Sequence, residues 1–310
     1  MADSRSTESS RPGAGDAAGE LEGKQGQRKA GFPAFRPETL LFIAPAALAL
    51  LISFYLPVIT LAGLDGRGTA EAAGKYLQDS LFWNSVLTTL TISASTTVLC
   101  LLLGVPTAIF IAHASRRAER LLIILVVASL FTSILLRSFV WYVLLGRHGP
   151  LAVAWAALSG SAGEGSLLFS RTAVVLGMAH ILLPMLIVMT WAPMRISARP
   201  QLGLSYQFSR SPLYYLIRVA LPANAPSITR AAFIIFILSI GFYVTPLLLG
   251  GGRGNTSMIG VLIDEQVNRF GSWTNAAALS LLLILLIAAL SAAAGLAVRG
   301  IRFGGRGGRP

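Results

Sequence analysis

The stretch from Thr172 to Trp191, TAVVLGMAHILLPMLIVMTW, decides the fold class of this chain. It contains no Asp, Glu, Lys or Arg. A helix needs about 20 apolar residues, at 1.5 Å each, to cross the hydrocarbon core of a bilayer. The stretch therefore predicts a transmembrane helix, because it is several times longer than an ordinary strand.

The rest of the chain repeats this pattern. The chain has 310 residues, of which 54% are hydrophobic and only 12% charged, whereas soluble domains carry about 25% charged residues. We expect an all-α membrane protein with six transmembrane helices, near Thr39–Ala62, Val86–Ala112, Leu121–Leu145, Thr172–Trp191, Ala231–Gly250 and Asn275–Val298.

Basic residues set the expected orientation. Eighteen of the 25 Lys and Arg residues fall in the N-terminal tail, the turn at 116–120, the segment 193–230 and the C-terminus. Six fall in the alternate loops, and Arg137 lies within a predicted helix. Positively charged loops stay in the cytoplasm, so both termini are predicted to be cytoplasmic. This distribution explains the net charge of +12 without nucleic acid as a partner.

The chain divides into four predicted parts. Residues 1–36 form a cytoplasmic tail that we expect to be disordered, because it has almost no large apolar side chains. Residues 37–80 hold the first helix and an external loop, residues 81–300 a transmembrane core with a cytoplasmic loop at 193–230, and residues 301–310 a basic tail.

The sequence lacks the residues that several kinds of site would need. Cys100 is the only cysteine and the three histidines lie far apart, so no metal or cofactor site is predicted. No Gly-Lys-Ser/Thr phosphate loop exists, and no nucleophile–base pair can be nominated, so no catalytic residue is predicted. No Asp or Glu lies inside a predicted helix, which disfavours an ion-coupled secondary carrier. That carrier remains the alternative, with an intramembrane enzyme less favoured.

The loop at 193–230 is the most informative connection. Five arginines alternate with Leu, Tyr and Phe, and Pro200, Pro212 and Pro222 are predicted to divide it into two short amphipathic helices. Such helices either lie under anionic lipid or bind a cytoplasmic partner.

The end of this loop, Val219-Ala220-Leu221-Pro222 with Pro212 before it, resembles the coupling motif of ABC importer permeases. The family's Glu-Ala-Ala triplet aligns with Gly203-Leu204-Ser205 and its glycine with Ser209, so the beginning of the motif is degenerate here. The segments 137–149 and 241–251 resemble permeases of the spermidine/putrescine type (MetI-like transmembrane domain). The resemblance implies a five-helix type I importer core preceded by one extra helix.

The resemblance also implies which residues take part in coupling and in transport. The residues expected to couple to an ATPase are Gly203, Leu204, Ser205, Phe208, Ser209, Pro212, Leu213, Arg218, Leu221 and Pro222. Those expected near the translocation pathway or a gate are Arg137, Trp141, Tyr142, Phe242 and Tyr243. From the residues alone two alternatives stay open: Arg137 pairs with a helix-end carbonyl, and the aromatic side chains form an interfacial belt.

The resemblance further implies partners and place. We expect two cytoplasmic ATPase subunits, a second permease subunit, an external solute-binding protein (periplasmic or lipid-anchored) and membrane lipid as partners. The chain would lie in the bacterial inner membrane, and its first expected substrate is a polyamine such as spermidine or putrescine.

Overall fold

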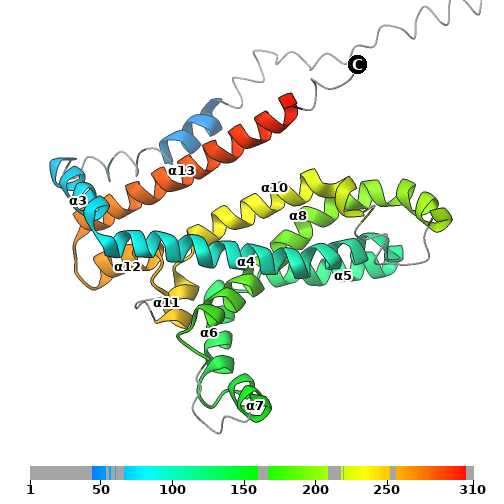
Figure 1. The fold of residues 1–310 in the computed structure, drawn as a ribbon, viewed down its shortest axis with the longest axis horizontal. Coiled ribbons are helices and arrows are strands. Elements are labelled where there is room, and N and C mark those ends of the chain that lie inside the picture. The colour runs from blue at the N-terminus through cyan, green and yellow to red at the C-terminus, as the bar shows by residue number, and fades with distance from the viewer. Residues whose placement is uncertain are drawn as a thin grey trace, which may run out of the picture. The chain divides into compact units, whose positions relative to one another are not determined.

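All regular structure in the described part of the chain is helical. The computed structural model describes residues 44–53, 66–159, 167–208, 220–251 and 256–304, together with single positions 56, 60 and 218. The helices after residue 60 are α3 (Gly66–Gln78), α4 (Ser80–His113), α5 (Arg116–Leu130), α6 (Ile134–Leu145), α7 (Pro150–Ser159), α8 (Arg171–Phe208), α10 (Leu221–Ile240), α11 (Val244–Gly250), α12 (Ile259–Asn268) and α13 (Trp273–Gly304) (Figure 1).

Among the described residues, four helices are long and apolar enough to cross a membrane, and a bent pair could supply a fifth crossing. The second, fourth and sixth predicted helices lie within α4, α8 and α13. Half of the first predicted helix lies outside the described residues. Its described portion, Ala44–Ser53, is a ten-residue apolar helix that belongs to a separate unit of the chain.

The third predicted helix is not continuous. Two helices, Arg116–Leu130 and Ile134–Ala154, meet there at an angle of 91°. The amides of Phe131 and Thr132 donate to carbonyls three residues back, which closes α5 in a tight last turn, and Ser133 precedes α6. The prediction of a single helix over Leu121–Leu145 was therefore wrong, although the bent pair still counts as one candidate crossing. Figure 1 shows α6 turning away from α5.

The fifth predicted helix is divided as well. α10 ends at Ile240, residues 241–243 leave the helical path, and α11 begins at Val244. The amides of Gly241 and Phe242 donate to carbonyls three residues back, as at the end of α5. α10 also begins at Leu221, ten residues before the predicted start, so Arg230 lies inside a helix rather than in a loop.

The loop predicted at 193–230 is largely helical at both ends. α8 continues through Pro200 to Phe208, so this proline does not divide the segment as predicted. A proline removes only one backbone donor, and a helix can pass through it with a local bend. The predicted external loops are not wholly irregular, because they contain α3, α7 and α12.

The core forms where α4, α8 and α10 pack together. Cys100, Ala108, Leu186 and Ile235 are fully buried there. Gly104 permits the close approach of α4 and α8, because a Cβ at this position would lie 2.5 Å from Cδ2 of Leu186. α12 is joined to α4 by its first amide, since Ile259 N donates to Oγ1 of Thr89 at 3.0 Å.

Candidate functional site

A buried carboxylate lies at the start of α5. Ser115 caps this helix: its hydroxyl accepts from the amide of Ala118, and its carbonyl accepts from the amide of Glu119 at 2.8 Å. The cap places Glu119 in the first helical turn, facing α8, where only 7% of its surface is exposed. A carboxylate buried to this degree needs charged or hydrogen-bonding partners.

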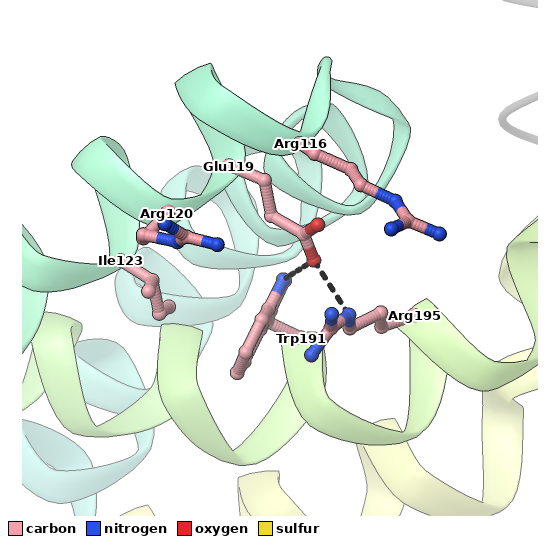
Figure 2. Close-up of a pocket in the computed structure, with 6 residues that line it drawn as sticks. All are labelled: Arg116, Glu119, Arg120, Ile123, Trp191 and Arg195. Carbon is pink, nitrogen blue, oxygen red and sulfur yellow. Dashed lines mark hydrogen bonds and ion pairs between the residues drawn. The ribbon is translucent and has the colours of Figure 1, made fainter.

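α8 supplies those partners. Oε1 of Glu119 accepts a hydrogen bond from Nε1 of Trp191 at 3.2 Å and forms an ion pair with Nε of Arg195 at 3.0 Å. The spacing of four residues places both donors on one face of α8, and the Arg195 guanidinium lies 5.6 Å from the centre of the Trp191 ring. Figure 2 shows both interactions converging on one carboxylate oxygen. The triad of Glu119, Trp191 and Arg195 therefore clamps α5 to α8.

A cavity of about 380 Å³ opens beside this triad. Arg116, Arg120 and Ile123 of α5 complete its lining with the three triad residues. Arg116 and Arg120 are exposed and lie on either side of Glu119 in Figure 2. The candidate membrane span of α8 ends at Ile196, and the helix runs on to Phe208. The Glu119 triad therefore lies at the base of the extension that carries the first predicted coupling residues.

The predicted coupling residues are only partly described. Gly203, Leu204, Ser205 and Phe208 lie on the helical backbone at the end of α8, and their side chains fall outside the described residues. Ser209, Pro212 and Leu213 also fall outside them. Arg218 is exposed, and Leu221 and Pro222 form the first turn of α10.

The Arg137 side chain holds the break between α5 and α6. Its Nη2 donates to the carbonyl of Thr132 at 2.8 Å, and its Nη1 lies 3.4 Å from the carbonyl of Ile181 on α8. Arg137 is only 8% exposed, and Nε has no hydrogen-bond partner among the described residues. The guanidinium thus pairs with the Thr132 carbonyl that the break leaves open, and it also reaches a carbonyl inside α8. The first contact is the helix-end pairing that the sequence left as one alternative.

The aromatic residues divide into two groups. Trp141 and Phe242 pack against one buried cluster around Met178 and Leu249, and the Trp141 ring meets His180 edge-on with centroids 5.9 Å apart. Tyr142 and Tyr243 are exposed. The five predicted pathway residues therefore do not share one lining in the described structure.

Sequence reasoning missed two pairs that join distant helices. Glu119 and Arg195 lay in separate predicted loops, and only their position on the same side of the membrane hinted at a pairing. Ser138 of α6 and Thr245 of α11 share a buried hydrogen bond of 2.9 Å between their hydroxyls. This bond ties together the two short helices that follow the breaks, and no local sequence signal marks it.

Comparisons with known proteins add independent information. No protein-family model matches the chain. The chain is 26% identical over 211 residues to the spermidine/putrescine transport system permease protein PotB of Escherichia coli (strain K12), covering 68% of this chain and 76% of PotB. It is 26% identical over 219 residues to the inner membrane ABC transporter permease protein YdcU of the same organism, covering 66% and 69%.

Two further matches extend the set. The molybdenum transport system permease protein ModB of Mycobacterium bovis is 28% identical over 196 residues, covering 63% of this chain and 72% of ModB. A chain of the bacterial alginate ABC transporter, solved with an alginate-bound periplasmic protein, superimposes with a TM-score of 0.63 at 16% identity, covering 86% of this chain and 96% of that one. In sequence and in fold, the chain is therefore similar to permease subunits of ABC transporters.

The described residues form an all-helical, multi-pass membrane fold with four or five candidate crossings. Within the ranges that the structure describes, no group of three or more His, Cys, Asp or Glu side chains could hold a metal ion. The geometry of the Glu119 triad suits a mechanical contact between two helices.

Proposed function

We propose that the permease carries a small organic solute into the cell across the bacterial inner membrane, and that ATPase subunits on separate chains supply the energy. A second permease subunit would complete the pathway, and an external binding protein would deliver the solute. The observation that carries this proposal is the similarity to importer permeases over about two thirds of the chain, together with a shared fold.

Energy would enter through the segment between α8 and α10. α8 projects beyond its membrane span as one helix to Phe208, and Arg218 just before α10 is exposed. A rigid helix transmits displacement along its length, so movement at the end of α8 would reach Arg195 and, through Glu119, the start of α5. This is a rigid-body coupling of the hinge and shear kind.

A polyamine remains the first substrate to test, because PotB is named for spermidine and putrescine. A polycation would need carboxylates along its path. The carboxylates near the predicted outer end of the bundle include Asp264 and Glu265 on α12, and Glu265 pairs with Arg269 at 3.6 Å.

A second substrate class is favoured by the cavity at that end. A cavity of about 690 Å³ is lined by Leu81, Asn84, Ser85, Leu87, Thr88, Thr91, Arg171, Ser257 and Leu262. Its lining combines hydroxyls, an amide and one arginine with no carboxylate, which suits a hydroxylated or anionic solute better than a polycation. One similar protein is named for molybdenum transport and another for import of the acidic polysaccharide alginate. Alginate and the oxyanion molybdate are solutes of this kind.

The coupling proposal is tested by charge reversal. In Arg218→Glu, an exposed cation becomes an anion at the proposed ATPase contact, and we expect loss of uptake and of ATPase co-purification with normal membrane insertion. Leu213→Asp tests the same segment. Arg147→Glu, an exposed change after α6, is the matched control. Normal uptake in both segment variants would overturn the proposal.

The substrate is tested separately. Cells that carry the permease with its neighbouring transport genes would be supplied with radiolabelled spermidine, putrescine, molybdate and a uronate. A polyamine substrate predicts uptake that excess putrescine suppresses and molybdate leaves unchanged. Uptake of molybdate or the uronate alone would replace the polyamine assignment with the second class.

A further inference from the structure

The cavity beside the Glu119 triad carries excess positive charge. Three arginines line it, from two helices, against one carboxylate. Oε1 of Glu119 already forms an ion pair with Arg195 and accepts a hydrogen bond from Trp191. Neither Arg116 nor Arg120 has an ion-pair partner among the described residues. Two guanidinium groups are therefore available at the mouth of a pre-formed cavity, and guanidinium groups bind phosphate oxygens in a two-point geometry.

The surroundings of the cavity are those of the membrane interface. Arg116 and Arg120 lie in the first turns of a helix whose next residues enter the apolar span, and Trp191 lies near the end of the candidate span Arg171–Ile196. Tryptophan is enriched at the level of lipid headgroups. A phosphate at this depth would lie in the headgroup layer rather than in bulk solvent.

An apolar stripe continues from the cavity along α5. Leu121, Ile124 and Leu125 are 60%, 55% and 58% exposed, and they follow one another at helical spacing on the side of α5 that α8 leaves uncovered. Ile123 provides an apolar residue in the cavity itself. Acyl chains could lie along this stripe while a phosphate group occupies the cavity.

We propose that this cavity binds the phosphate of an anionic phospholipid headgroup, with Arg116 and Arg120 as its ligands and the α5 stripe as the bed for the acyl chains. The clamp between Glu119 and Arg195 holds the two walls of the site in place. The lipid would thereby occupy the junction from which the α8 extension begins. This assignment goes beyond the transport proposal and does not depend on the solute carried.

The test uses the purified full-length chain and native mass spectrometry. Phosphatidylglycerol and phosphatidylcholine of identical acyl chains are titrated, and inorganic phosphate is titrated in a parallel arm. Arg116→Gln and Arg120→Gln are compared singly and together with Arg117→Gln, an exposed arginine of the same turn that does not line the cavity. Unfolding temperatures verify that each variant is folded.

We expect one phosphatidylglycerol to be retained in preference to phosphatidylcholine. Each cavity arginine removed should weaken its binding about fivefold, as expected for one basic residue near an anionic surface, whereas Arg117→Gln should change it less than twofold. Saturable binding of inorganic phosphate with the same arginine dependence would also support the site and identify free phosphate as a ligand. The proposal would be overturned if Arg117→Gln weakened binding as much as the cavity variants do. It would also be overturned if phosphatidylglycerol bound no better than phosphatidylcholine and inorganic phosphate did not bind saturably.

Discussion

At the scale of single residues, Arg137 shows how a charged side chain can be structural inside a membrane helix pair. Its guanidinium donates to Thr132, at the end of α5, and reaches Ile181 on the neighbouring α8. Polar groups in the hydrocarbon region must be satisfied by the protein, because no water is available there. Arg137 therefore permits the 91° bend that the sequence does not predict.

Replacing Arg137 should lower the unfolding free energy of the protein, because the residue has a structural role. Arg137→Gln cannot reach both carbonyls, so we expect a loss of about 1–3 kcal/mol in unfolding free energy, from buried acceptors left unpaired. Arg137→Lys should recover only part of it, since an ammonium lacks the planar fork. Unfolding in mixed detergent micelles measures the unfolding free energy of both variants. An unchanged stability combined with altered uptake would instead indicate a gate residue.

The Glu119–Arg195 pair is expected to be weaker. The carboxylate is buried, but the Arg195 side chain is 52% exposed and solvent screens it. A double-mutant cycle with Glu119→Gln and Arg195→Gln should give a coupling of about 1 kcal/mol. The pair Glu265–Arg269, at 3.6 Å and four residues apart at the end of α12, is the control and should give about 0.3 kcal/mol. Equal coupling energies for the two pairs would show that burial of Glu119 does not strengthen its ion pair.

At the scale of helices, the α4–α8 contact depends on a residue without a side chain. A Cβ at Gly104 would lie 2.5 Å from Cδ2 of Leu186 and 3.1 Å from Cδ1 of Leu183. Gly104→Val should therefore separate the helices and cost about 1–3 kcal/mol. Gly295→Val on α13 is the control, because nothing lies within 4 Å of its added Cβ. Equal melting temperatures for the two variants would contradict the packing argument.

Apolar length predicted the positions of α4, α8 and α13, because hydrophobicity over about twenty residues is a strong signal. The two breaks escaped prediction for a physical reason. Residues 131–133, Phe-Thr-Ser, contain neither proline nor glycine, and the bend there depends on Arg137 and on Ile181, which is 44 positions away along the chain. The Glu119 triad escaped for the same reason, since its energy comes from a contact between helices and not from a local motif.

At the scale of the whole molecule, the Glu119 triad and the helices α6, α11 and α12 lie toward opposite ends of the spans. Glu119 and Arg195 lie at one end, where α5 begins and α8 leaves its candidate span. Toward the other end lie α6 and α11, which follow the two breaks, and α12. Coupling to a cytoplasmic ATPase requires the first end to face the inside. The excess of arginine near that end predicts this orientation.

Single cysteines can decide the orientation. The native Cys100 is fully buried between α4 and α8, so it should not react and needs no replacement. Arg147→Cys and Arg269→Cys, both exposed, should react with a membrane-impermeant maleimide in intact spheroplasts. Arg117→Cys and Arg218→Cys should react only after lysis, because the proposal places them inside. The reverse pattern would put the α8 extension on the wrong side for any intracellular ATPase, and would remove the basis for energy coupling through it.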